Sequence, residues 1–528
     1  MALRSPVSRT GVVIFVLALL LGLALAWLPI LPMIAVGLGG LTALIILLRP
    51  VWGVVLLIPV IPFSPLLSLE LAGYRVGGME ALLAFTLLAW LAGMAARHRI
   101  TLPHPPLLLP WLIWLAVIMV SWLVALSLGA AVSETAKWLE MLALYLLVVA
   151  IVDTRHLPWL VAATLAAGVA QAALGVYQSV WQVGPQGFVL VEGQFLRAYG
   201  TFQQPNPYAG YLGLVLPVAG SLILHGLLPG RSATLSATPR QLLPYNTRSL
   251  LLTFCSLLPV FILLLIGLYV SQSRGAWLGA AAALAVVGVA RSRRAAAVFS
   301  VLMVGVACLL ALGATGWLPS SVTQRFADVL PVVSLPNLAT AEVTDANFPA
   351  IERLAHWQAA LDMWRDHTWL GVGFGNYPVV YPAYAVGRWL EPLGHAHNFY
   401  LNVAAETGLL GLLAYGLFWL SVARLAWQAV RGTQGWWRAL AIGALGSLVH
   451  LTVHNVVDNL YVQGMYLHIS ITLGLLTVIW RAGQAANRAR QPAPISDPWA
   501  RHTPKAAGSG DCRRTAPASA RSSPRCAT

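Results

Sequence analysis

Long apolar runs recur along this chain and are separated by short polar segments. Most runs approach the roughly 20 residues that a helix needs to cross the hydrocarbon core of a bilayer. The pattern predicts an all-α polytopic bundle of about fourteen membrane-spanning helices. By number, the predicted spans are 11–28, 32–48, 51–69, 79–96, 107–129, 137–153, 157–178, 207–228, 249–270, 275–290, 296–317, 399–423, 438–457 and 461–480.

Two of these runs allow a second interpretation. The third contains Pro59, Pro62 and Pro65, so it is either a kinked span or a re-entrant segment. The first ends in Ala24-Leu25-Ala26, which resembles a signal-peptidase site. We expect the first helix to remain uncleaved. Whether or not it is cleaved, the chain that follows it starts on the outer side of the membrane.

The basic residues give this alternation an orientation. Most of the 32 lysines and arginines fall in segments on one side of the predicted membrane, including the N-terminus and the C-terminal tail. Because cytoplasmic loops are enriched in lysine and arginine, both termini are predicted to be cytoplasmic. Eight basic residues remain outside: Arg75, Lys137, Arg197, Arg274, Arg325, Arg353, Arg365 and Arg388.

Composition supports a membrane protein and argues against a nucleic-acid binder. The chain has 528 residues, of which 59% are hydrophobic and 9% are charged, whereas a soluble domain carries roughly 25% charged residues. The net charge of +15 lies in short clusters between apolar runs, with no basic domain interleaved with aromatics. The four cysteines lie in predicted spans or in the tail, so no disulfide framework is expected.

The spans and loops predict three regions. Residues 1–180 form N-terminal transmembrane helices, and residues 181–480 form a second membrane domain with a long outer loop at about 318–398. Residues 481–528 are rich in Arg, Pro, Ala and Ser and are predicted to be a disordered tail near the anionic inner leaflet.

Two outer arginines lie where a charge is costly. Arg197 comes shortly before a span, and Arg274 in Ser271-Gln-Ser-Arg-Gly-Ala-Trp277 lies in a turn between two spans. Neither has an acidic neighbour within one helical turn. A guanidinium in such a place suits a phosphate or diphosphate, which it can bind with two parallel hydrogen bonds; the alternative is contact with lipid headgroups.

The outer loop is predicted to contain a helix. Leu354, Trp357, Leu361 and Trp364 recur at helical spacing and form one apolar stripe, with Arg353 off that stripe. The helix either lies on the membrane surface or packs on the bundle. A flexible turn with three glycines, residues 371–376, is expected to end it, and no strand–helix frame supports nucleotide binding there.

Histidines follow at the end of this loop, in Gly394-His-Ala-His-Asn-Phe-Tyr400. His395 and His397 could serve as bases near neutral pH, bind a metal or be structural. Glu391 and Glu406 are not at a recognisable spacing for a third metal ligand. Glu406 lies about two turns into the next span, where it could pair with an arginine.

A second polar group lies near the end of the membrane domain. His450, His454 and Asp458 share one helical face at a spacing of four, with Asp458 at the outer end. They either line the same cavity or form an interhelical hydrogen-bond cluster, and the cluster is the favoured interpretation.

Together these motifs resemble the O-antigen ligase family, whose shared domain also occurs in O-antigen polymerases and pilin glycosylation ligases. The histidine motif is matched by His397-Asn398, nine residues, Gly408, two residues and Gly411. Arg274 in Ser-Arg-Gly and Arg197 before Gly-Thr-Phe match the family's two arginine positions. The resemblance covers about residues 190–480. The predicted number of spans exceeds the twelve usual for lipopolysaccharide ligases.

The resemblance implies a GT-C-like membrane glycosyltransferase of the bacterial inner membrane that acts on the outer face. It implies transfer of a saccharide from undecaprenyl diphosphate to a hydroxyl of a lipid-linked or surface glycan, with inversion and without ATP, cofactor or metal. Arg197 and Arg274 would bind the diphosphate and His397 would be the base. The supporting residues would be His395, Asn398, Arg353, Glu406, His454 and Asp458.

Three alternatives remain at this point. A polymerase of the same superfamily would use the same donor, with a second lipid-linked glycan as acceptor. A secondary transporter would suit the number of spans, but the sequence contains no paired repeat and no matched broken helices. A membrane scaffold would leave the two arginines and His397 without a purpose.

Overall fold

The computed structural model describes residue 22 and residues 30–66, 68–71, 74–98, 103–190, 195–227, 247–292 and 348–490, with single positions 297, 301, 338 and 343. The chain divides into a large unit, Met1–Gln484, and a second unit, Ala485–Thr528. The packing described below is that of the large unit.

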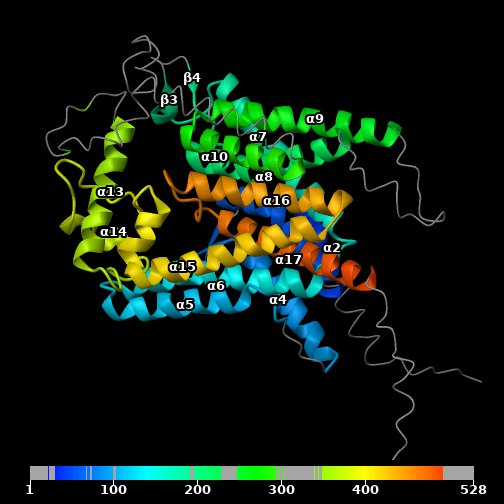
Figure 1. Ribbon diagram of the computed structural model, residues 1–528, viewed down its shortest axis with the longest axis horizontal. Coiled ribbons are helices and arrows are strands. Elements are labelled where there is room, and N and C mark those ends of the chain that lie inside the picture. Colours follow the sequence, from blue (N-terminus) through cyan, green and yellow to red (C-terminus); the bar gives the residue numbers. More distant parts are fainter. Residues whose placement is uncertain are drawn as a thin grey trace, which may run out of the picture. The chain divides into compact units, whose positions relative to one another are not determined.

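Helices make up most of the described chain (Figure 1). The shorter elements are the hairpins β1–β2 (Ser68–Leu71 and Tyr74–Gly77) and β3–β4 (Val189–Leu190 and Phe195–Leu196), the one-turn helix α14 (Tyr377–Val380) and several 3-10 turns. The longer helices are α2 (Ile30–Leu48), α3 (Val51–Phe63), α4 (Gly78–Ala96), α5 (Leu108–Ser121), α6 (Leu128–Ile151), α7 (Leu157–Val180), α8 (Pro205–Leu227), α9 (Thr247–Val270), α10 (Arg274–Arg291), α13 (Phe348–Asp366), α15 (Phe399–Gly432), α16 (Gly435–His454) and α17 (Met465–Arg490).

This architecture confirms the predicted all-α polytopic membrane class. Among the described residues, seven helices are long and apolar enough to cross a membrane, and four shorter apolar helices accompany them. The predicted spans 11–28 and 296–317 lie outside the described residues, apart from a few single positions.

Some predicted boundaries are wrong. The span expected at 51–69 ends as a helix at Phe63, because Pro59 and Pro62 each lack a backbone N–H donor and the chain then enters the β1–β2 hairpin. Helix α6 begins at Leu128, nine residues earlier than expected, with the Ser127 side chain accepting a hydrogen bond from the backbone N–H of Ala130. Helix α17 continues to Arg490, so residues 481–490 of the expected disordered tail are helical.

Helix α8 lies at the centre of one group of helices. It packs against α16, α9, α10 and α7, and nearly all of its apolar stretch is buried. Small residues allow the close approach: a Cβ on Gly443 of α16 would lie 2.8 Å from Cα of Val218 on α8. Helix α15 contacts α5, α13 and α16, so it connects this group to the outer segment.

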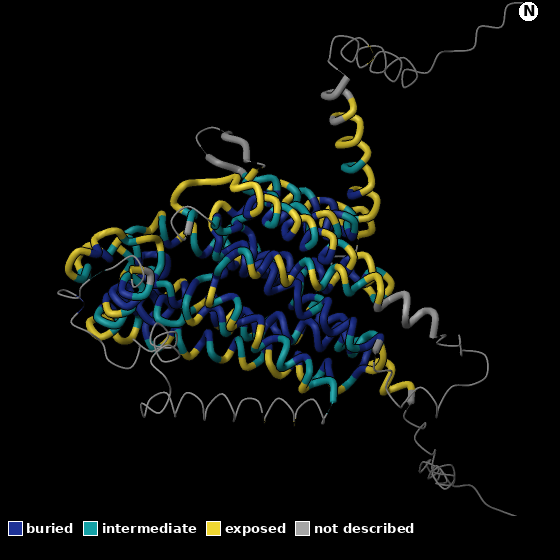
Figure 2. The backbone as a smooth tube through the Cα atoms, turned by 90° about the horizontal axis from the view of Figure 1, so that it is seen from above, coloured by how far each residue is buried: buried dark blue, intermediate teal, exposed yellow. Residues whose placement is uncertain are grey.

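The outward faces of the helices are apolar. Leu410, Leu413, Leu417 and Leu420 recur every three or four residues along α15 and are all exposed. Figure 2 shows buried positions gathered inside the helix bundle and exposed ones along its outer helices. An exposed apolar stripe of this length suits contact with lipid.

Candidate active site

The loop that carries His397 is held tightly against the start of α15. His397 has a left-handed backbone with φ of 51°, and Gly394 has a φ of 83°. A non-glycine residue in this region is uncommon, and such strain concentrates at functional sites where the surroundings enforce it. The Asn398 side-chain oxygen accepts hydrogen bonds from the backbone N–H groups of Tyr400 and Leu401 at 3.0 and 3.1 Å. Asn398 therefore caps α15 and positions His397.

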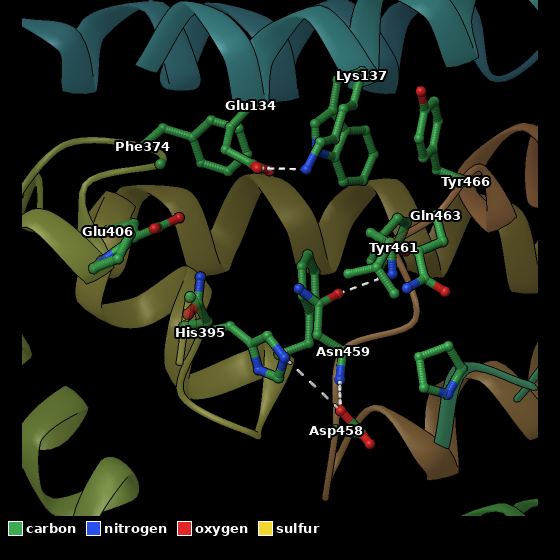
Figure 3. Close-up of a pocket in the computed structure, with 18 of the residues that line it drawn as sticks. Glu134, Lys137, Phe374, His395, Glu406, Asp458, Asn459, Tyr461, Gln463 and Tyr466 are labelled. Atoms are coloured by element: carbon green, nitrogen blue, oxygen red, sulfur yellow. Dashed lines mark hydrogen bonds and ion pairs between the residues drawn. The ribbon is translucent and has the colours of Figure 1, made fainter. Parts of the chain in front are cut away.

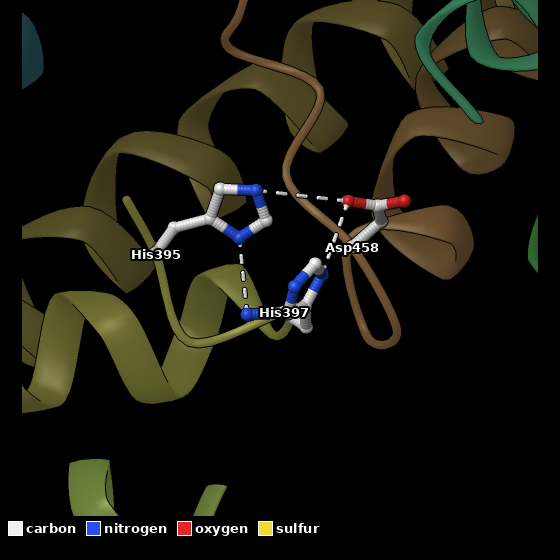
Figure 4. A group of neighbouring side chains, drawn as sticks. All are labelled: His395, His397 and Asp458. Carbon is white, nitrogen blue, oxygen red and sulfur yellow. Dashed lines mark hydrogen bonds and ion pairs between the residues drawn. The ribbon is translucent and has the colours of Figure 1, made fainter. Parts of the chain in front are cut away.

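Asp458 faces both histidines of this loop (Figure 4). Its Oδ1 lies 3.9 Å from Nδ1 of His397 and 4.0 Å from Nε2 of His395. Asp458 belongs to the segment between α16 and α17, so two separate parts of the chain build the pair. The imidazole of His397 thus faces Asp458, and both of its ring nitrogens are buried without a hydrogen-bond partner among the described residues.

The two histidines differ in what their ring nitrogens can do. Nδ1 of His395 accepts a hydrogen bond from the backbone N–H of His397 at 3.0 Å, so this nitrogen is not protonated. Neutral His395 therefore carries its proton on Nε2, directed toward Asp458. The lone pair on Nδ1 of His395 already accepts this hydrogen bond, so His397 is the better base of the two.

These three side chains also bear on metal binding. Ligand atoms of His395, His397 and Asp458 lie within 4.8 Å of one another, so Asp458 supplies the third ligand that the sequence spacing did not indicate. However, a histidine that binds a metal through Nε2 keeps its proton on Nδ1, and Nδ1 of His395 is occupied as an acceptor. The hydrogen bonding therefore favours an imidazole–carboxylate pair over a metal centre.

The electrostatics fit an ionised Asp458 beside a neutral His395. Burial alone would raise the pKa of Asp458, but the approach of His397, His395 and His454 outweighs burial and holds that pKa well below its usual range. Burial, with the nearby charge of His397, lowers the pKa of His395 to about 4. At neutral pH, Asp458 is therefore ionised and His395 is neutral.

The two arginines predicted from the sequence meet at one turn. Arg274 begins α10 directly after the turn that follows α9, as the sequence predicted. Arg197 donates from Nε to the backbone oxygen of Ser271 in that turn, at 3.0 Å, and from NH2 to Oδ1 of Asn206 at 3.1 Å. Burial lowers the pKa of Arg197 to about 10, helped by Arg353 and Arg274 and opposed by Asp458. A Cβ on Gly275, the residue after Arg274, would lie 2.5 Å from Cγ2 of Val457, so this turn packs directly beside the segment that carries Asp458.

Helix α13 contributes residues that the sequence interpretation missed. His356 is buried, and its ring lies 5.7 Å from that of His397, between centroids, and stacks on Tyr381 at 4.6 Å. Its Nδ1 is 2.9 Å from the hydroxyl of Tyr377. Burial, followed by the charge of His397, lowers the pKa of His356 to about 4. The position of His356 one helical turn after Arg353 is the signal that could have indicated it.

The buried face of α13 differs from the predicted stripe. Of the four stripe residues, Leu354 is buried, whereas Trp357 and Trp364 are half-buried. Small residues such as Ala355 and Ala359 form the buried face instead, because α13 packs closely on α15. Trp357 is nevertheless connected to the site, since its indole N–H donates to the backbone oxygen of His397 at 3.2 Å.

The glycine-rich segment after α13 is anchored and is not the free turn expected from the sequence. The backbone N–H groups of Val372 and Gly373 donate to the oxygens of Ala405 and Glu406 at 2.8 and 3.0 Å. The carboxylate of Glu406 accepts the backbone N–H of Tyr377 at 3.0 Å. Glu406, for which an arginine partner was considered, thus holds the outer loop on α15.

Gly408 of the histidine motif has a related structural purpose. It interrupts α15 with φ 62° and ψ −160°, a conformation open almost only to glycine. A Cβ there would lie 2.3 Å from the carbonyl carbon of Trp369. The backbone N–H of Leu409 instead donates to the oxygen of Thr368 at 2.7 Å. The motif therefore encodes the contact between loop and helix that places His397.

His450 and His454 lie on the buried side of α16. A Cβ on Gly213 of α8 or Gly279 of α10 would lie 1.9 or 2.8 Å from the ring of His450, so both glycines make room for it. The ring of His454 lies 5.4 Å from that of His450, between centroids, and packs beside Gly275. The two rings pack together between the helices, but none of their four ring nitrogens has a hydrogen-bond partner among the described residues, so the favoured hydrogen-bond cluster is not seen there. His454 also acts on Asp458.

A cavity of about 340 Å³ adjoins the histidines. Its wall includes His395, Asp458, Glu406 and Glu134 (Figure 3). None of the predicted arginines is among its described lining residues. The site therefore has an arginine side and a carboxylate side, with Asp458 near both.

Comparison with known proteins gives a family match and similar solved structures. No curated protein matches the chain. A chain in the solved structure described as "Structural coordination of polymerization and crosslinking by a peptidoglycan synthase complex" is 17% identical, with a TM-score of 0.38. That alignment covers 71% of this chain and 97% of the other. The family model described as O-antigen ligase matches residues 259–416.

The family match confirms the resemblance stated from the sequence. It extends from the second half of α9 through the outer loop into α15, so it contains Arg274, His397 and Gly408. Arg197 and Asp458 lie outside the matched residues. At the level of the family, the match implies a glycosyltransferase of the ligase type that uses lipid-linked glycans. Over residues 259–416, this chain is thus similar to the O-antigen ligases.

Proposed function

We propose that this protein transfers a saccharide from a polyprenyl diphosphate carrier to a hydroxyl of an acceptor glycan on the outer face of the bacterial inner membrane. The observation that carries the proposal is the His397–Asp458 pair close to Arg197 and the turn that begins α10. It combines an oriented base with cationic groups suited to a diphosphate.

In the proposed reaction, His397 takes the proton of the attacking hydroxyl. Its Nδ1 faces Asp458, so Nε2 accepts the proton, and the carboxylate stabilises the imidazolium that forms. The hydroxyl oxygen bonds to the anomeric carbon as the bond from that carbon to the diphosphate oxygen breaks. The electron pair leaves with the diphosphate, and the anomeric configuration inverts in a single displacement.

The leaving diphosphate gains negative charge, and the arginines stabilise that charge. Arg197 is held by Ser271 and Asn206, so its guanidinium is positioned before the donor binds. Preorganised donors of this kind each contribute on the order of 10²–10³ in rate. Since these cations need no metal, we propose metal-independent transfer. The diphosphate link itself supplies the driving energy, so no ATP is required.

The membrane setting is part of the proposed mechanism. Arg274 lies at the end of a helix suited to cross the bilayer, and the His397 loop leads directly into another. We place the polyprenyl chain between the spans and both chain termini in the cytoplasm. The donor then enters from the lipid with its diphosphate at the arginines.

The test is transfer by purified protein in liposomes that contain a glycan linked to undecaprenyl diphosphate. His397→Ala and Arg274→Ala should abolish transfer while membrane insertion is unchanged. The matched controls are His367→Ala and Arg365→Ala, which alter exposed side chains of the same outer segment and should retain activity. Full activity of His397→Ala or Arg274→Ala contradicts the proposal.

The same assay separates a ligase from a polymerase. A ligase transfers the glycan to a different surface glycan, such as a lipid A core. A polymerase lengthens the glycan on a second donor molecule and yields a ladder of products.

A further inference from the structure

The cavity beside His395 has a lining that the diphosphate chemistry does not use. It lies between α6, the start of α15 and the segment from Asp458 to Gln463 (Figure 3). Its volume of about 340 Å³ is near the lower end of the range for small-molecule sites, which is roughly 300–1,000 Å³. It is therefore suited to a compact ligand.

One wall of the cavity is aromatic. The rings of Trp138 and Tyr461 lie 5.2 Å apart and those of Phe399 and Tyr461 lie 4.4 Å apart, between centroids. All three residues line the cavity. Aromatic faces in contact with one another form a rigid apolar platform, and the C–H face of a pyranose ring packs on such a surface.

The cavity also offers polar groups. Glu134 and Lys137 of α6 form an ion pair and remain partly exposed, at 40% and 31% of their side chains. The Oε1 atom of Gln463 is buried and has no hydrogen-bond partner among the described residues. A buried acceptor without a donor indicates that another molecule supplies one. A sugar hydroxyl is such a donor, and the carboxylate of Glu134 accepts a second.

The charge of the lining selects among sugars. Asp458 presents an ionised carboxylate to the cavity, and the one ammonium group among the lining residues, that of Lys137, is already paired with Glu134. A diphosphate or an acidic sugar would meet like charge here, and like charges brought together without solvent are strongly disfavoured. A neutral sugar meets hydrogen-bonding groups and aromatic rings without this repulsion.

We propose that this cavity binds the neutral terminal sugar of the acceptor glycan. The assignment rests on the proposed function, because it makes the arginine side the donor site and the carboxylate side the acceptor site. His395 and Asp458 line the cavity and Asp458 faces His397, so a sugar bound here lies beside the proposed base.

The binding test uses free monosaccharides and purified protein in detergent, with saturation-transfer-difference NMR as the readout. Glucose, galactose or N-acetylglucosamine should give saturable signals, and glucuronate should give none. Farnesyl diphosphate, a short donor mimic, should not displace the neutral sugar. The proposal is overturned if none of the neutral sugars binds, if glucuronate binds as well as they do, or if farnesyl diphosphate displaces them.

Two cavity variants and two controls locate the binding. Glu134→Gln and Gln463→Leu should weaken binding of the neutral sugar about tenfold, as expected for loss of a hydrogen bond to a charged or buried group. Glu391→Gln and Gln186→Leu make the same chemical changes at exposed positions outside the cavity and should leave binding unchanged. Equal weakening by the controls, or none by the cavity variants, places the sugar elsewhere.

Transfer kinetics separate this inference from the function on which it rests. In an active preparation, Glu134→Gln should raise the KM for acceptor about tenfold and leave the KM for donor unchanged. If the wild type transfers glycan but the acceptor KM does not move, the cavity assignment is wrong and the function stands. If the wild type binds neutral sugars but transfers nothing, the proposed function fails, and with it the acceptor role of the cavity.

Discussion

Replacing Asp458 with asparagine would remove the negative charge that faces His395 and His397. Asparagine has nearly the same shape and keeps one side-chain oxygen as an acceptor. The substitution therefore tests the charge and not the packing. In our mechanism, the missing charge raises the free energy of the transition state, in which His397 becomes positively charged.

The distances in the site set the size of this effect. Oδ1 of Asp458 lies 3.9 Å from Nδ1 of His397, and two unit charges at about 4 Å interact by about 4 kcal/mol at an effective dielectric constant of about 20. Since about 1.4 kcal/mol corresponds to a factor of ten in rate, kcat should fall by about 10³. The substrate KM values should change little, because the charge on His397 develops only in the transition state.

The assay is steady-state transfer in liposomes, with kcat and both KM values measured for Asp458→Asn. Asp362→Asn is the matched control, because Asp362 forms a surface ion pair with Arg365 on α13 and should retain full activity. A properly inserted Asp458→Asn protein whose kcat falls less than tenfold would refute the role of this carboxylate. A large rise in KM with unchanged kcat would assign Asp458 to substrate binding instead.

Three other substitutions probe the stability and the diphosphate side of the site. Gly408→Ala should lower the free energy of unfolding by about 1–3 kcal/mol through backbone strain, and further through the contact with Trp369. The measurement is the melting temperature, and an unchanged melting temperature contradicts the kink. Burial lowers the pKa of His356 in the folded state to about 4, from its ordinary 6.5. Between these pH values the unfolded chain binds more protons than the folded one, so stability falls as the pH drops from about 6.5 to 4. Thermal unfolding of His356→Gln should show less of this loss. Arg197→Lys should lower kcat about 10²–10³-fold, because an ammonium lacks the planar fork with which the guanidinium bonds Ser271 and Asn206 and still offers parallel donors to a phosphate. A near-normal kcat would exclude a bidentate role.

Local features of the fold followed from the sequence because they depend on neighbouring residues. The apolar runs predicted most described helices within a few residues, and the turn before Arg274 was placed correctly between α9 and α10. The start of α6 was missed because Glu134 and Lys137 break the apolar run there. A helix can carry such polar residues where one side faces a cavity instead of lipid.

The arrangement of the site depends on contacts between distant segments, which one sequence does not specify. The sequence identified His397 and Asp458 separately but contained nothing to indicate that they face each other. His356 was missed because the tryptophans of α13 dominate its apolar pattern, whereas its buried face is made of small residues. The glycines of the outer loop were noticed, but their purpose depends on the close approach of α15, since a Cβ on Gly371 would lie 2.4 Å from the backbone oxygen of Ala405.

The central claim is that this protein cleaves a glycosyl–diphosphate bond with its own side chains. The most direct measurement is the release of undecaprenyl diphosphate by purified protein, counted against the new glycosidic bonds formed, with and without a strong chelator. We predict one undecaprenyl diphosphate for each new bond, at a rate that the chelator does not change. Absence of release, or release that stops when metals are removed, would contradict the account.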